Sequence, residues 1–138
     1  MYRKQKICVL IPAFNEELLI GTVLASMPTY VDCVLVVNDG STDRTAEIAK
    51  SHGAIVVSHI TNRGVGASLQ TGISRALESG CDIVVNIDAD NQFNPADIEK
   101  LINPIVESKA DFVTASRFKI KEYLPKMSKI KKTHRTAI

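Results

Sequence analysis

Two carboxylates, Asp88 and Asp90, directly follow an apolar segment, and the amide of Gln92 comes two residues later. Side chains two residues apart in an extended chain lie on the same side, so the two carboxylates should face one point. Carboxylates held this close repel each other unless a cation lies between them, and oxygen ligands suit Mg²⁺ or Mn²⁺. The spacing therefore predicts a divalent metal site formed by Asp88, Asp90 and Gln92. The simpler alternative is that the two carboxylates cap the helix expected from Pro95, but Asn94 is better placed to do so.

Three further positions carry polar groups that suit a nucleotide. Asp39 offers an acceptor for a ring imide N–H or a ribose hydroxyl, although Asp-Gly is also an ordinary turn signal. Glu16 and Glu17 begin an expected helix, where carboxylates interact favourably with the helix dipole. Glu16 is also placed for a ribose contact. Arg117 is a fixed cation suited to a phosphate, or to a surface ion pair.

The glycines at 64 and 66 resemble part of a dinucleotide-binding fingerprint, but the third glycine position is occupied by Leu69. We expect Gly64 and Gly66 instead to let a loop pass close to a ligand and to begin a helix whose free N–H groups face it. The histidines at 52, 59 and 134 stand apart from one another, and we assign them no role.

Regular alternation of strands and helices must position these residues. Five segments are apolar at nearly every position, as expected for a parallel sheet covered by helices on both faces. They are Lys6–Pro12, Cys33–Asn38, Ala54–Ser58, Asp82–Asp88 and Asp111–Ser116. The helices expected between and after them are Glu16–Met27, Asp43–His52 (with Ser41 and Thr42 as candidate N-caps), Gly66–Ser79 and Pro95–Val106. The pattern predicts a three-layer α/β/α fold whose polar clusters meet at the carboxyl edge of the sheet.

Composition narrows the class of protein. The 138 residues are 45% apolar, which is typical of one globular domain. No apolar stretch reaches the ~20 residues of a membrane span, and the N-terminus reads as a first strand and not as a signal peptide. The thiols Cys8, Cys33 and Cys81 are odd in number and widely spaced, so we expect buried, reduced thiols in the cytoplasm and not a metal or redox site.

Charge divides the chain into two parts. Residues 1–118 carry a net charge of −4, whereas residues 119–138 hold seven Lys and Arg and one Glu. The tail also has apolar residues at roughly helical spacing, interrupted by Pro125. A basic amphipathic helix of this kind lies on anionic lipid at the inner face of a membrane, or else it begins a larger domain, which is the interpretation we favour.

Taken together, these motifs resemble the N-terminal, nucleotide-sugar-binding part of family 2 glycosyltransferases of the GT-A fold, and most of all the dolichol- or polyprenyl-phosphate sugar synthases. The matching segments are 9–17, 37–45, 62–67, 88–92 and 116–118. The substrate-binding residues that the resemblance implies are Pro12, Ala13, Asn15, Glu16, Asp39, Gly66, Asp88, Ala89 and Arg117, with Asp88, Asp90 and Gln92 as metal ligands.

The resemblance implies a UDP- or GDP-sugar donor, Mg²⁺ or Mn²⁺ as cofactor, and inverting transfer to a polyprenyl phosphate or a glycan. It implies no nucleic-acid partner and leaves the oligomeric state open. Residues 1–118 would be the donor-binding domain, and 119–138 the start of an acceptor-side segment. Family members continue past this length, so we expect a truncated chain that lacks its acceptor-side base, or else a non-catalytic nucleotide-sugar-binding fragment. The usual His-Pro pair after the metal motif is replaced here by Phe93, Asn94 and Pro95.

Overall fold

A four-stranded parallel sheet forms the centre of the molecule, which a computed structural model describes for residues 1–115. Its strands are β1 (Ile7–Ala13), β2 (Cys33–Asn38), β3 (Ile55–Ser58) and β4 (Ile83–Asn86). They lie in the order β3-β2-β1-β4, so the first strand is central and is paired on both sides. The expected parallel sheet is confirmed.

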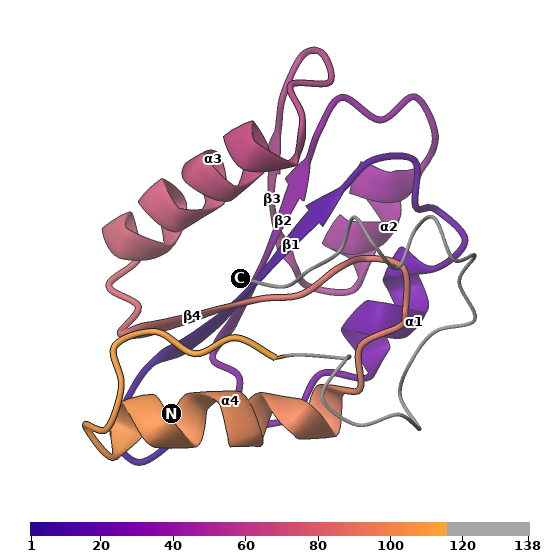
Figure 1. The fold of residues 1–138 in the computed structure, drawn as a ribbon. Coiled ribbons are helices and arrows are strands. Elements are labelled where there is room, and N and C mark those ends of the chain that lie inside the picture. The colour runs from indigo at the N-terminus through magenta and orange to yellow at the C-terminus, as the bar shows by residue number, and fades with distance from the viewer. Residues whose placement is uncertain (116–138) are drawn as a thin grey trace, which may run out of the picture.

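Helices cover both faces of this sheet (Figure 1). They are α1 (Ile20–Ala25), α2 (Thr45–Ser51), α3 (Val65–Glu78) and α4 (Ile98–Val106), the last preceded by a 3₁₀ turn, η1 (Pro95–Asp97). One layer of the core joins alternate residues of β1 to α1, α2 and α4, and the other joins the remaining residues of β1 and β2 to α3. This is the three-layer α/β/α arrangement predicted from the two-sided apolar strands.

Small residues let α3 lie close to the sheet. Ser68, Gly72 and Ala76 are its buried residues, and their spacing of four places them on one face of the helix. A Cβ atom at position 72 would overlap the side chain of Leu10 on β1. This close packing fixes where α3 begins relative to the end of β1.

The expectation of a fifth strand at Asp111–Ser116 is wrong for residues 111–115, which form no strand. A strand needs a neighbour for its backbone groups and a surface against which to bury its side chains. Phe112 is instead 82% exposed, and β4 is an edge strand of the sheet among the described residues. Ser116 lies outside the described part of the chain, as do Arg117 and the basic tail 119–138.

The expected helix Glu16–Met27 is shorter in the structure, where α1 begins at Ile20. Its predicted apolar face is correct, since Ile20, Val23 and Leu24 are buried. Within residues 1–115, no helix has the length and the apolar character needed to cross a membrane.

Candidate functional site

The register of the sheet brings three strand ends into one row. Ala13 at the end of β1 is paired with Asn38 of β2, which is paired in turn with Ser58 of β3. The segments that follow these strands therefore leave the sheet at the same edge. On the other side of β1, Ile87 continues the pairing beyond β4, because its N–H donates to Leu10 O at 3.0 Å. The polar clusters predicted after the first four strands thus meet at this carboxyl edge.

The loops after β1 and β2 are joined by reciprocal hydrogen bonds. The N–H of Asn15 donates to Ser41 Oγ at 3.0 Å, and the N–H of Thr42 donates to Asn15 Oδ1 at 2.9 Å. The N–H of Glu16 donates to Oγ1 of the buried Thr45 at 2.8 Å. The side chain of Asn15, a predicted substrate contact, therefore helps to fix the loop that presents Glu16.

The start of α2 is organised by Asp43, and not by Ser41 or Thr42 as expected. Asp43 Oδ1 accepts the N–H of Thr45 at 2.9 Å, and Oδ2 accepts the N–H of Glu17 at 3.1 Å. Ser41 and Thr42 do not cap the helix, since Ser41 Oγ accepts the N–H of Asn15 and Thr42 Oγ1 donates to Asn15 Oδ1 at 3.4 Å. Burial raises the pKa of Asp43, but the hydrogen bonds outweigh it and hold the pKa of this carboxyl below its usual range.

Asp39 is a buried carboxylate that holds a second loop in place. It is 4% exposed, and its Oδ1 accepts the N–H of Arg63 at 2.9 Å while its Oδ2 accepts the N–H of Gly64 at 2.8 Å. Oδ1 also lies 2.7 Å from Nδ1 of His59. Burial raises the pKa of Asp39, but these three hydrogen bonds prevail and leave it below its usual value. The carboxylate therefore remains ionised at neutral pH and links β2 to the start of α3.

His59 is a member of this site that the sequence analysis missed. Its side chain is 6% exposed and bridges Asp39 to Thr71 of α3, with Nε2 lying 2.9 Å from Thr71 Oγ1. Because an ionised carboxylate only accepts hydrogen bonds, Nδ1 carries the proton toward Asp39. Its position directly after β3, at the edge where the other polar groups lie, was the signal that would have revealed it.

The backbone of Gly40 packs directly against the loop that follows β3. Its φ of +74° lies in the left-handed region, and a Cβ atom there would lie 2.5 Å from the carbonyl carbon of Thr61. Only glycine combines this conformation with so close an approach. The loops after β2 and β3 thus pack directly against each other, and the hydrogen bonds of Asp39 also join them.

Helix α3 begins at Val65 behind Gly64, whose φ is +88°. The expectation that these glycines begin a helix is confirmed within one residue. A Cβ atom at Gly66 would meet nothing within 4 Å, so open space lies beside the first turn of the helix. This space faces a helix start, where free N–H groups favour an anion.

Replacing Gly66 with alanine distinguishes a role of this residue in ligand binding from a role in the stability of the fold. Because the site is open and helical, the variant should be as stable as the wild type or about 0.5 kcal/mol more stable. If a ligand passes close to the helix start, the added methyl group should weaken binding of UDP or GDP about 10-fold, or ~1.4 kcal/mol. Ser74→Ala, at an exposed position of the same helix, is the matched control for nucleotide affinity measured by calorimetry. Equal affinities for the two variants would remove Gly66 from the site.

Asp88 and Asp90 follow β4 and alternate with the buried Ile87 and Ala89. Alternation of this kind places both carboxylates on the side of the chain away from the core, as the sequence predicts. Asp88 is exposed and Asp90 is half-buried. Asp90 Oδ1 accepts the N–H of Gln92 at 3.0 Å, which closes a tight turn through Asn91 at a φ of +58°.

Negative charge accumulates where the loops after β1 and β4 meet. The pKa of Glu16 is raised, first because its carboxyl group is partly desolvated and then because Asp90 and Asp43 repel its charge. Glu16 therefore lies within electrostatic reach of Asp90, a relationship that follows from the pairing of β1 with β4. A cation placed among these groups would relieve the repulsion.

The chemistry of this donor set fits a hard divalent ion. Asp88, Asp90 and Gln92 supply only carboxylate and amide oxygens, which Mg²⁺ and Mn²⁺ prefer. Glu16 lies within electrostatic reach of this donor set through Asp90.

The remaining predicted residues border this edge. Pro12 is half-buried and Ala13 is buried at the end of β1, and Ala89 is buried between the two aspartates. Arg117 lies outside the described residues, so its predicted phosphate contact stays a prediction.

Comparison with known proteins agrees with this geometry. The family model for glycosyl transferase family 2 matches residues 8–136. An uncharacterised protein of Methanocaldococcus jannaschii, MJ1222, is 43% identical over 94% of this chain and 54% of its own length. The UDP-N-acetylglucosamine–dolichyl-phosphate N-acetylglucosaminyltransferase of Methanococcus voltae is 36% identical over 82% of this chain and 52% of its own. The chain therefore spans about half the length of these relatives.

A solved structure shows the same fold. Glucosyl-3-phosphoglycerate synthase from Mycobacterium tuberculosis, crystallised with Mn²⁺, UDP-glucose and phosphoglyceric acid, superposes with a TM-score of 0.62 at 34% identity. The match covers 75% of this chain and 40% of the synthase.

Proposed function

Because the chain belongs to glycosyl transferase family 2, we propose that it binds a nucleoside-diphosphate sugar, with UDP or GDP as the nucleotide, through Mg²⁺ or Mn²⁺. The donor lies along the carboxyl edge of the sheet, with its diphosphate at the loop after β4 and its nucleoside toward the loops after β1 and β2. The observation that carries the proposal is the pairing of β1 with β4, which brings the loops after them, with Glu16, Asp88 and Asp90, to one edge of the sheet.

Asp88, Asp90 and Gln92 hold the metal ion in this proposal. When bound, the metal neutralises the charge that develops on the departing nucleoside diphosphate. The N–H groups at the start of α3 provide partial positive charge nearby. Pro12 and Ala13 at the end of β1, with the loop after them that the bond between Asn15 and Ser41 holds, form a fixed wall for the nucleoside.

Asp39 acts mainly as a support in this account. Its carboxylate already accepts three hydrogen bonds, so its capacity for a nucleotide N–H is limited to a remaining lone pair. Asp39 affects the nucleoside indirectly, because it fixes residues 62–64, the loop that leads to Gly66. A support role predicts that replacing Asp39 destabilises the fold, whereas a direct contact with the nucleotide alone does not.

The acceptor in the proposed reaction is a polyprenyl phosphate or a glycan, and transfer inverts the anomeric centre. A polyprenyl phosphate is already anionic and needs no general base, whereas a glycan hydroxyl does. The support for a lipid phosphate is that the Methanococcus voltae relative is named for dolichyl phosphate. The same acceptor would bring the protein to a membrane surface, where the basic tail 119–138 offers positive charge.

A thermal-shift titration tests donor binding. The 138-residue chain is heated with Mn²⁺ and increasing UDP, GDP or ADP, the last as a nucleotide control. UDP or GDP at 100 times its dissociation constant should stabilise the fold by about 2.7 kcal/mol, and ADP should do so far less. The absence of stabilisation by both UDP and GDP would contradict the proposal.

A further inference from the structure

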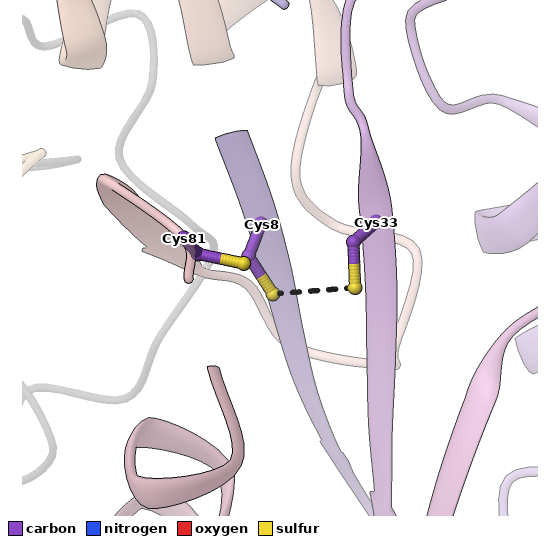
Figure 2. A group of neighbouring side chains, drawn as sticks. All are labelled: Cys8, Cys33 and Cys81. Carbon is purple, nitrogen blue, oxygen red and sulfur yellow. Dashed lines mark hydrogen bonds between the residues drawn. The ribbon is translucent and has the colours of Figure 1, made fainter. Parts of the chain in front are cut away.

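Three thiols that are far apart in the sequence meet at the other end of the sheet. Cys8 is on β1, Cys33 begins β2, and Cys81 precedes β4. Figure 2 shows their side chains pointing toward one another across the neighbouring strands. Within residues 1–115 they are the one group of three His, Cys, Asp or Glu side chains whose ligand atoms all lie within 4.8 Å of one another.

Their spacing matches that of ligands around a single metal ion. Zinc–sulfur bonds are about 2.3 Å long, so three sulfurs around one ion lie roughly 4 Å from one another. The Sγ atoms of Cys8 and Cys33 are 3.8 Å apart, and all three cysteines are free thiols. The group therefore needs only small side-chain adjustments to surround an ion.

The backbone holds each of these cysteines in place. Cys8 and Cys33 are direct partners in the parallel register of β1 and β2. The N–H of Cys81 donates to Ala76 O at the end of α3, at 3.1 Å. The next residue, Asp82, donates its N–H to Lys6 O at 2.9 Å, which ties this segment to the start of β1. Ligands fixed in this way lose little conformational entropy on binding.

Apolar side chains and one ammonium group surround the three thiols. The thiols border a cluster of apolar side chains that includes Leu10, Leu35 and Ala76. Burial raises the pKa of Cys8 and of Cys81, so these thiols stay protonated until an ion displaces the protons. The ammonium group of Lys6 counters this at Cys81, where it lowers the pKa, and it would offset the negative charge of a thiolate complex.

We propose that Cys8, Cys33 and Cys81 together bind one thiophilic metal ion of the Zn²⁺ or Cu⁺ class. Each thiol loses its proton to solvent and binds the ion as a thiolate, with no change of oxidation state. Sulfur ligands favour such ions over Mg²⁺ or Mn²⁺, so this site and the aspartate edge differ in the metal that they select. Ala13 lies five positions after Cys8 along β1, or about 17 Å at strand spacing. The ion therefore acts on the stability of the sheet and takes no part in the proposed transfer.

Metal titration of the reduced 138-residue chain tests the proposal. Under anaerobic conditions, Zn²⁺ and Cu⁺ are each titrated against a chromophoric competing chelator. One ion per chain should bind to the wild type and equally to Asp88→Asn, which alters the predicted hard-metal site. Cys33→Ala and Cys81→Ala, at partly buried positions, should each weaken binding at least 100-fold while keeping the circular dichroism of the fold. Binding that survives the loss of either cysteine would overturn the proposal.

Alkylation of the unaltered chain provides a readout that needs no substitution. Rates at Cys33 and Cys81 are measured by mass spectrometry with and without one equivalent of metal. Protection of both by at least 10-fold with Zn²⁺ or Cu⁺, and not with Mg²⁺, is the expected result. Equal rates under all conditions would overturn the proposal, as would a reduced chain that retains neither ion and forms a Cys8–Cys33 disulfide on oxidation.

Discussion

Replacing Asp88 with asparagine is expected to weaken Mn²⁺-dependent binding of UDP or GDP about 100-fold, or roughly 3 kcal/mol. Asparagine keeps the shape of the side chain but removes the charge that attracts the ion. Asp88 is exposed beyond the end of β4, so the thermal stability of the free chain should be unchanged. Nucleotide affinity with and without Mn²⁺ is measured by calorimetry for both proteins.

Asp97→Asn is the matched control for this experiment. Asp97 lies in the 3₁₀ turn after the metal motif and forms an exposed ion pair with Lys100 at 2.6 Å. It carries the same charge near the same loop, but it is not a predicted ligand. An equal loss of affinity in both variants would show a general charge effect, and unchanged affinity in Asp88→Asn would remove Asp88 from the metal site.

Asp39→Asn should lower the free energy of unfolding by about 3 kcal/mol. The carboxylate now accepts hydrogen bonds from three donors, on His59, Arg63 and Gly64. In the variant, the amide NH₂ group would face one of these donors and could not accept its hydrogen bond. One buried donor would lose its partner. Urea denaturation at pH 7 measures the change. Glu78→Gln is the control, because Glu78 is exposed and forms a surface ion pair with Arg75, so its replacement should cost less than about 0.5 kcal/mol. If Asp39→Asn also costs less than about 0.5 kcal/mol, the direct contact with the nucleotide would remain as the role of Asp39.

The effect of Asp39 should depend on pH in a defined direction. Its pKa is lower in the folded protein than in the unfolded chain, where it is about 3.9. The unfolded state then binds the proton more readily, so the stabilisation is complete above about pH 4 and is lost as the pH falls through the folded value. The stability difference between wild type and Asp39→Asn should accordingly be constant near neutral pH and shrink in acid. A difference that grows in acid would contradict the direction of the shift.

The sheet was predictable because its two central strands, β1 and β2, are apolar and largely buried. Val34–Val37 and Ile83–Val85 are apolar without alternation, and helices with their own apolar faces separate them. Segment 111–115, Asp-Phe-Val-Thr-Ala, also holds aromatic and β-branched residues but forms no strand, since local composition does not supply a neighbour to pair with. The carboxyl-edge position of Asp88 and Asp90 followed from the same reasoning.

Contacts that depend on the order of the strands were not predictable from the sequence. The bonds between Asn15 and Thr42 exist because β1 and β2 are neighbours, and β-α alternation alone leaves this order open. The pairing of β1 with both β2 and β4 likewise brings together Cys8, Cys33 and Cys81, whose wide spacing suggested unrelated buried thiols. In each case the residue types were known from the sequence, but not which distant segments of the chain lie side by side.

Calorimetric titration of UDP and GDP into the 138-residue chain, with Mn²⁺ and then with EDTA, tests whether this edge binds a metal-bound diphosphate. One nucleotide should bind per chain in the presence of Mn²⁺, and the affinity should be at least 10-fold lower once the ion is removed. Linkage requires that nucleotide raise the affinity for Mn²⁺ by the same factor. Equal affinity with and without the ion, or no binding of either nucleotide, would contradict the assignment of this edge to a metal-bound diphosphate.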